Sequence, residues 1–121
     1  MFRFEKVDAW KRSVAYASEL LEITERLPQR YQFSFGEQLR RAGLSLGSNI
    51  AEGCGRGEGR DAARFFAISR GSVYEVVSIL EMMRQRGLVD ETDHRRLYQE
   101  ADEIARMLTG LIKRNRNLQS K

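Results

Sequence analysis

The stretch QLRRAGLSLGSNIAEG, residues Gln38–Gly53, decides the fold that we expect for this chain. Leu39, Leu46 and Ile50 recur at helical spacing and give the stretch an apolar stripe. Glycines and serines between them keep the sides of this helix thin. A glycine costs about 1 kcal/mol relative to alanine inside a helix, and a helix that carries glycine usually gains close packing in exchange. We therefore predict that neighbouring helices approach this one closely.

Local signals mark where the expected helices begin and end. Ser34 and Glu37 have the spacing of a capping box, whose side chains satisfy free backbone N–H groups at a helix start. Pro28 ends the preceding helix, because the residue before a proline is pushed out of the α region. Gly87 is a candidate C-cap, and Asp90 is a candidate N-cap. The expected helices cover about residues 6–27, 35–53, 60–86 and 91–115.

These helices are amphipathic and joined by short links. In the first helix the apolar residues are spaced by three and four, which is typical of helices packed at shallow angles. This expected seam consists of Val7, Trp10, Val14, Ala17 and Leu21, and Leu20 and Ile23 widen it to the broader apolar face of a bundle helix. Four long amphipathic helices predict an all-α fold, an antiparallel up-down-up-down four-helix bundle. We expect residues 1–121 to form one domain, because 121 residues suit one domain and no internal repeat is visible.

The composition predicts a cytoplasmic protein without a membrane segment. Hydrophobic residues make up 41% and charged residues 31%, a mix typical of globular proteins. The single cysteine, Cys54, cannot form an internal disulfide, and the N-terminus lacks the apolar core of a signal peptide. No apolar run approaches the roughly 20 residues of a transmembrane helix.

The charge of the chain is mildly basic, at +4, and most of its 21 basic residues are arginine. The planar guanidinium group of arginine can donate two hydrogen bonds to one phosphate, which suggests RNA or DNA as a partner. The alternative is coding bias in a GC-rich genome, because acidic residues are interleaved almost throughout. Two clusters are candidate nucleic-acid contacts. They are Arg56, Arg60 and Arg64 beside a glycine-rich segment, and Lys113, Arg114 and Arg116 in the C-terminal tail.

Each cluster has an alternative interpretation. The glycine-rich segment GCGRGEG, Gly53–Gly59, matches neither the P-loop nor the dinucleotide-binding pattern, so we interpret it as a flexible connector rather than a phosphate cradle. The arginines after it lie beside an expected helix N-terminus, where an anion site is plausible. Glu58 and Asp61 among them count against such a site. The tail, residues 113–121, is either a basic arm or a frayed, solvated end.

Polar residues at steps of three and four share one side of the second expected helix. They are Arg41, Ser45, Ser48, Asn49 and Glu52, and Ser72 and Glu75 could face them from the third helix. One interpretation is a polar pocket or a contact between subunits. The other is a buried network that fixes the register of the helices, in which the serines bond back to helix carbonyls. We expect Asn49 and Glu52 to be half-buried in either case.

The sequence offers little material for catalysis or for a cofactor. A metal site needs three or four converging ligands, whereas His94 is the one histidine and we expect it at the surface. Cys54 and His94 show no sign of a nucleophilic pair, and the Glu-x-x-His pairs of a di-iron bundle are absent. We therefore expect no metal, no cofactor and no enzymatic activity. The enzyme hypothesis that remains would place a site at Asn49 and Glu52.

The block RRAGLSLGSNIAEG resembles the four-helix-bundle proteins encoded in intervening sequences of bacterial 23S ribosomal RNA genes. The pattern of that family has an aromatic residue near the start of the first helix, a Q-L-R-R-A-x-x-S-I-x-S-N-I-A-E-G block, and then G-S-x-x-E. It is matched here by Trp10, by Gln38–Gly53, and by the segment from Gly71 to Glu75. Leu46 and Gly47 depart from the pattern, which prefers isoleucine or valine followed by proline. The resemblance covers nearly the whole chain.

The resemblance implies a homo-oligomer, commonly a ring-shaped pentamer. Distant relatives of the family are accessory proteins of diversity-generating retroelements, which work with a reverse transcriptase and bind nucleic acid through a basic surface. We therefore predict a non-enzymatic homo-oligomeric bundle that binds RNA or DNA through arginines. The alternative is a protein–protein assembly module whose basic charge is incidental.

Overall fold

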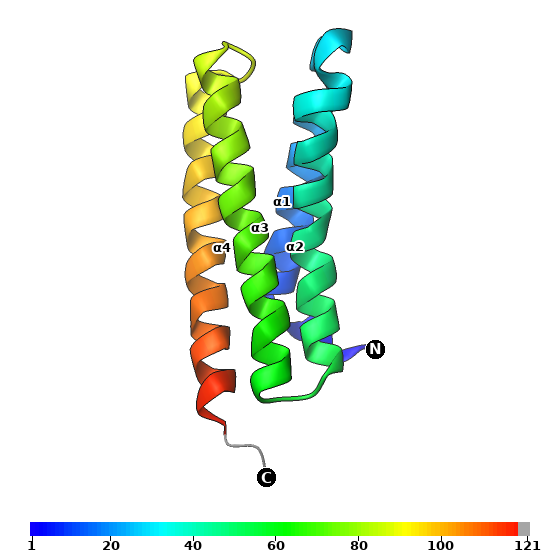
Figure 1. Ribbon diagram of the computed structural model, residues 1–121, viewed down its shortest axis with the longest axis vertical. Helices are drawn as coiled ribbons and strands as arrows, with labels where there is room; N and C mark the ends of the chain where they lie inside the picture. The colour runs from blue at the N-terminus through cyan, green and yellow to red at the C-terminus, as the bar shows by residue number, and fades with distance from the viewer. Residues whose placement is uncertain (119–121) are drawn as a thin grey trace.

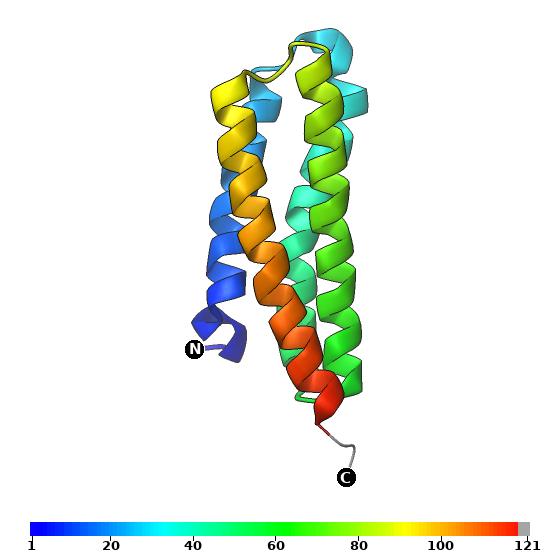
Figure 2. The same ribbon diagram turned by 90° about the vertical axis from the view of Figure 1, so that its left-hand side faces the viewer.

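The computed structural model describes residues 1–118, and within them four long helices run antiparallel, up-down-up-down (Figures 1 and 2). These helices are α1 (Asp8–Glu25), α2 (Glu37–Gly55), α3 (Arg60–Gln85) and α4 (Glu91–Asn117). Consecutive helices pack on one another along their lengths, and α4 also touches α1. The described residues contain no strand. The predicted all-α four-helix bundle is confirmed.

Both ends of the described chain lie at the same end of the bundle, beside the α2–α3 connection (Figures 1 and 2). At that end the chain begins with a 3₁₀ helix, η1 (Arg3–Lys6). The α1–α2 and α3–α4 connections lie at the opposite end. The first of these contains a 3₁₀ turn, η2 (Gln29–Tyr31), and a π-helical turn, η3 (Gln32–Gly36). No helix within residues 1–118 has the length and apolar character needed to cross a membrane.

The apolar stripe of α2 lies at the centre of the core, as the sequence predicts. Leu39, Leu46 and Ile50 are each 0% exposed. The close approach expected of α2 is tightest at a glycine that the sequence did not single out. A Cβ atom built on Gly53 would lie 2.7 Å from Cε1 of Phe66, too close for any real side chain. Gly53 therefore lets the end of α2 meet the start of α3.

The expected seam of α1 is wrong by one position along the helix. The core instead takes the stripe Ala9, Ser13, Tyr16, Leu20 and Ile23, of which only Leu20 and Ile23 belonged to the predicted apolar face. Tyr16 and Leu20 fill the core, and the buried Tyr16 hydroxyl donates a hydrogen bond to the carbonyl of Leu97 at 2.9 Å. The seam that the sequence predicted lies at the side of the core, where Val14 is 45% exposed. Thus α1 carries two apolar stripes, and periodicity alone did not show which of them is buried.

The predicted capping box at Ser34 is also wrong. The chain makes a π-helical turn there, and α2 begins at Glu37 without a side-chain cap. Gln32 ties the connection together instead, because its side-chain amide donates to the carbonyls of Thr24 and Leu27 at 2.8 and 3.0 Å. Arg40 then donates to the side-chain oxygen of Gln32 at 3.1 Å. Gln32 thus satisfies free carbonyl groups at the end of α1, whereas the capping box was expected to satisfy free N–H groups at the start of α2.

The signals at the α3–α4 connection are confirmed. Gly87 has a φ of 72°, and the amide of Leu88 donates to the carbonyl of Met83 at 2.9 Å, which is the Schellman pattern of a glycine C-cap. The Asp90 side chain accepts from the amide of Asp93 at 2.7 Å and caps the start of α4.

Candidate nucleic-acid interface

Arginines from α3 and α4 meet at the end of the bundle that holds the chain ends. Arg60, Arg64 and Ala67 of α3, together with Arg116 of α4, line a hollow of about 460 Å³, which we call the arginine hollow. The structure thus brings together residues from the two clusters that the sequence treated as separate. Three guanidinium groups around one open hollow form a site suited to phosphate oxygens.

A buried asparagine holds the start of α3 against the end of α4. Asn115 is 4% exposed, and its side-chain oxygen accepts from the amide of Gly59 at 3.0 Å. Gly59 has a φ of 118°, a backbone conformation that favours glycine, and it directly precedes α3. The asparagine also donates to the carbonyl of Leu111 at 2.8 Å within α4. This contact sets Arg116 beside Arg60, and no local sequence signal points to it.

The arginines of the hollow differ in how they are paired. Within residues 1–118, Arg60 and Arg116 form no ion pair with an acidic side chain. Arg64 donates to Asp61 at 3.1 Å, and its guanidinium lies 4.5 Å from the ring centroid of Phe65. Asp61, one of the two acidic residues that counted against an anion site, therefore pairs with the arginine on one side of the hollow.

The other candidate contacts lie outside the hollow. Arg56 pairs with Glu52 at 2.9 Å and with Asp61 at 3.7 Å. Arg114 lines a different hollow, between α1 and α4. Lys113 is exposed on α4, three residues before Arg116 and hence on the same side of the helix. The predicted C-terminal tail is helical up to Asn117, and its residues 119–121 lie outside the described chain.

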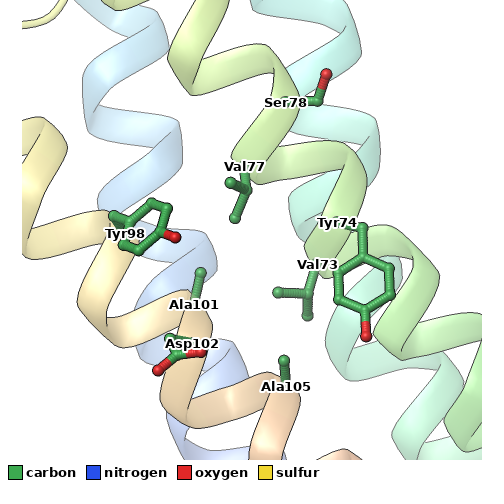
Figure 3. A pocket seen from close by; sticks show the side chains of 8 residues that line it. All are labelled: Val73, Tyr74, Val77, Ser78, Tyr98, Ala101, Asp102 and Ala105. Carbon is green, nitrogen blue, oxygen red and sulfur yellow. The ribbon is translucent and has the colours of Figure 1, made fainter.

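The outer side of α3 and α4 continues from the hollow into an aromatic groove of about 310 Å³. Figure 3 shows Tyr98 of α4 and Val77 of α3 pointing into this groove from opposite sides. Tyr74 and Tyr98 are more than half exposed, at 57% and 53%. Ala101 and Ala105 line it with small side chains. We call this region the tyrosine groove.

A second groove, between α1 and α2, has a different character. No residue that lines this α1/α2 groove of about 480 Å³ is charged. The lining residues include Trp10, Val14, Ala17, Leu21, Leu44 and Gly47. Most of the α1 seam that the sequence assigned to the core thus lines this groove. Leu44 at its rim is 58% exposed.

Part of the predicted polar set forms a hydrogen-bond network between α2 and α3. The hydroxyls of Ser45 and Ser72 lie 2.8 Å apart, and the Asn49 side chain donates to the Ser45 hydroxyl at 2.9 Å. Ser69, which the sequence did not single out, donates to the carbonyl of Leu46 at 2.8 Å. Ser48 bonds back to the carbonyl of Leu44 at 3.2 Å.

The charged members of that set lie at the exposed edge. Arg41 pairs with Glu37 at 3.4 Å, and Glu52, which was expected to be half-buried, is exposed and pairs with Arg56. Glu75 is exposed and takes part in no ion pair among the described residues. The structure therefore gathers the serines and the asparagine but leaves the charges at the surface.

Some of the remaining charged groups join helices, and others pair within one helix. Arg12 of α1 donates to Glu100 and Glu103 of α4 at 2.6 and 2.7 Å, and the hydrogen bond that Glu100 accepts contributes most to raising the pKa of Arg12. On α3, the hydrogen bond from Arg84 lowers the pKa of Glu81 to about 2. Burial raises the pKa of the Cys54 thiol, which makes it a poor nucleophile near neutral pH.

His94, which we expected at the surface, is mostly buried. Its side chain is 14% exposed, and its Nε2 lies 3.3 Å from Glu81. Within residues 1–118, no three histidine, cysteine, aspartate or glutamate side chains gather to hold a metal ion.

Comparison with known proteins identifies one family, and comparison with solved structures identifies a protein of the same fold. The sequence pattern of the family described as 23S rRNA-intervening sequence protein matches residues 5–110. A crystal structure of a protein from Bacteroides thetaiotaomicron, described as of unknown function and from the S23 ribosomal protein family, has the same fold. The TM-score is 0.80 at 20% sequence identity, over 87% of this chain and 98% of that one. None of the curated proteins matches the sequence.

Proposed function

The chain belongs to the family of 23S rRNA-intervening sequence proteins, and from this premise we propose that it is a non-enzymatic, homo-oligomeric bundle that binds RNA or DNA. The arginine hollow carries the proposal. Arg60, Arg64 and Arg116 converge there, and phosphate oxygens are the ligands that guanidinium groups hold best. Lys113 extends the same side of α4 with another positive charge.

Self-association rests on the α1/α2 groove, whose occupant we take to be a second copy of this chain. An uncharged groove gains nothing from a charged partner, and a charge buried against it would be left unpaired. Leu44 and Val14 at the rim of the groove are exposed apolar side chains, which contact with a second copy would bury. In this contact the second apolar stripe of α1, which includes Trp10 and Val14, would pack against the other copy.

We propose that the oligomer is a ring of five. A ring needs a contact in which the groove of one copy receives a different surface of the next. Five copies carry about +20 in total, since each carries +4, so the weak field of one chain becomes a strong one for polyanions. The proposed place of action is the cytoplasm.

The second candidate function is a protein–protein assembly module with incidental charge. The α1/α2 groove favours it, because an apolar groove on its own predicts assembly and says nothing of nucleic acid. The two candidates differ in what the arginines do. In the assembly module, reversing the charges of the arginine hollow changes no binding property.

Binding of the purified protein to labelled structured RNA and duplex DNA across a salt series tests the proposal, with the mass in solution measured alongside. We expect an oligomer that binds tightly at low salt and loses affinity steeply as salt rises, because each neutralised phosphate releases condensed counterions. An intact oligomer that binds neither probe at physiological salt contradicts the proposed function and favours the assembly module.

A further inference from the structure

The arginine hollow and the tyrosine groove are parts of one continuous face. Ala67 lines the hollow and Tyr74 lines the groove, and both lie on α3. Seven residues of helix separate them, which is about 10 Å along the axis. This is the gap between the two linings; the proposed contacts themselves lie farther apart, since Arg116 and Tyr98 are separated by 18 residues of α4, about 27 Å along the axis. A single strand covers that length in roughly eight nucleotides at ~3.4 Å each.

The charges along this face change from one end to the other. The hollow is lined by three arginines and no acidic residue. Between hollow and groove, Arg70 donates to the Thr109 hydroxyl at 3.0 Å and so spans α3 and α4. Asp102 is the one charged residue that lines the groove, and it accepts from Arg106 at 3.1 Å. One end is thus built for an anion, and the other end is close to neutral.

The neutral end has the shape of a stacking site. Tyr98 presents an aromatic ring that is 53% exposed, beside a space that Ala101 and Ala105 leave open (Figure 3). The groove of about 310 Å³ falls at the lower end of the roughly 300–1,000 Å³ typical of ligand pockets. A flat aromatic ligand stacked on Tyr98 would contact the tyrosine ring and the apolar side chains of the groove.

We propose that this face binds single-stranded nucleic acid, with backbone phosphates in the arginine hollow and an unpaired base stacked on Tyr98. The proposal rests on the proposed function and specifies its substrate class. Every base has a face that can stack on an aromatic ring, whereas the bases of a duplex are already stacked on one another. A second protein helix in the groove would leave Arg60 and Arg116 of the hollow without anionic partners, so the charge distribution favours the nucleic acid.

The test compares an unstructured 20-nucleotide RNA, the DNA of the same sequence and the corresponding RNA duplex. Wild type is compared with Tyr98→Ala, with Tyr98→Phe, which keeps the stacking ring, and with Phe33→Ala, an exposed aromatic residue outside the groove. We expect Tyr98→Ala to weaken single-strand binding by about 5- to 150-fold and to leave duplex binding within about twofold. Tyr98→Phe restores the single-strand affinity, and Phe33→Ala leaves it unchanged. The RNA and DNA arms show whether the 2′-hydroxyl contributes.

Each contrary outcome identifies what has failed. If Tyr98→Ala keeps full affinity for the single strand, or weakens single strand and duplex equally, stacking is overturned and the proposed function stands. If Tyr98→Ala instead lowers the mass of the oligomer, the groove is a contact between copies and the inference is overturned. If wild type binds none of the three probes at physiological salt, the proposed function fails together with the inference. Helix content by circular dichroism confirms that each variant is folded.

Discussion

The two grooves of this bundle differ in the charged residues that lie beside them. The α1/α2 groove is lined by uncharged residues, with Trp10 and Leu44 among them. The face formed by α3 and α4 begins at three arginines and continues into a groove with two exposed tyrosines. In a chain with 31% charged residues, a groove without charge suits another copy of the chain, and a face with clustered arginine suits a polyanion.

An apolar stripe on a helix can serve a purpose other than burial within one copy of the chain. The core stripe of α1 includes Tyr16 and Leu20, which are fully buried. Its second stripe, which includes Trp10 and Val14, borders the α1/α2 groove. We infer that the surplus stripe is retained for contact with a second copy.

The largest expected effect is the loss of assembly on placing a charge in the α1/α2 groove. Leu44→Glu puts a carboxylate at the rim, where it would be buried without a partner in the assembled protein. Leu44 is 58% exposed in the single chain, so the fold tolerates the change. Light scattering after gel filtration is expected to give the 14.0 kDa of one chain for this variant.

The matched control for assembly is Phe33→Glu. Phe33 is 80% exposed and lines neither groove, so this variant is expected to keep the wild-type mass. If Leu44→Glu also keeps the wild-type mass, the α1/α2 groove is not the contact between copies.

The next effect is on nucleic-acid affinity. The triple variant Arg60→Glu, Arg64→Glu and Arg116→Glu is expected to weaken binding about 10²- to 10³-fold, because three charge-assisted contacts are lost. The slope of log affinity against log salt is expected to fall by about 3 per binding site, one for each lost phosphate contact. A filter-binding or anisotropy titration at several salt concentrations measures both quantities.

A triple variant with the same change in net charge provides the control. It carries Lys11→Glu, Arg26→Glu and Arg30→Glu, all exposed positions outside the arginine hollow. This control is expected to weaken binding far less than the first triple variant. Equal weakening by both would mean that only the total charge matters, and the hollow would lose its special role.

A smaller effect is expected on the stability of the fold beside the hollow. Gly53→Ala would force its new Cβ against Phe66 and is expected to cost about 1–3 kcal/mol of unfolding free energy, as overpacking does. Gly55→Ala is the matched control, because a Cβ there has nothing within 4 Å. Denaturant unfolding should show a loss for the first variant and no loss for the second. Equal midpoints would contradict the tight α2–α3 contact.

The smallest expected effect concerns pH at the far end of the α3/α4 face. The hydrogen bond from Arg84 lowers the pKa of Glu81 from 4.5 to about 2, so the ionised carboxylate stabilises the fold above pH 4.5. This stabilisation is lost as the pH falls towards 2. Glu81→Gln is therefore expected to lower the melting temperature slightly at pH 7 and not at pH 2, whereas Glu75→Gln changes neither. A melting difference for Glu81→Gln that is independent of pH would contradict this account.

The sequence predicted the four helices, their order and most of their ends, because helical periodicity and caps such as Asp90 are local signals. It did not predict which side of α1 faces the core, since both apolar stripes of that helix have helical spacing. It located the basic clusters but not their meeting at the arginine hollow. That meeting depends on the contact between Asn115 and Gly59, which are 56 residues apart in the chain.

Ultraviolet crosslinking of a bound single-stranded RNA to the wild-type oligomer, with the crosslinked residues identified by mass spectrometry, tests the division between the two grooves most directly. Aromatic residues that stack on bases are the expected crosslinking sites. The tyrosine groove contains Tyr74 and Tyr98, and the α1/α2 groove contains Trp10. The account predicts crosslinks at Tyr98 or Tyr74 and none at Trp10. Crosslinks at Trp10 with none at the two tyrosines would place the nucleic acid in the α1/α2 groove and contradict the central claim.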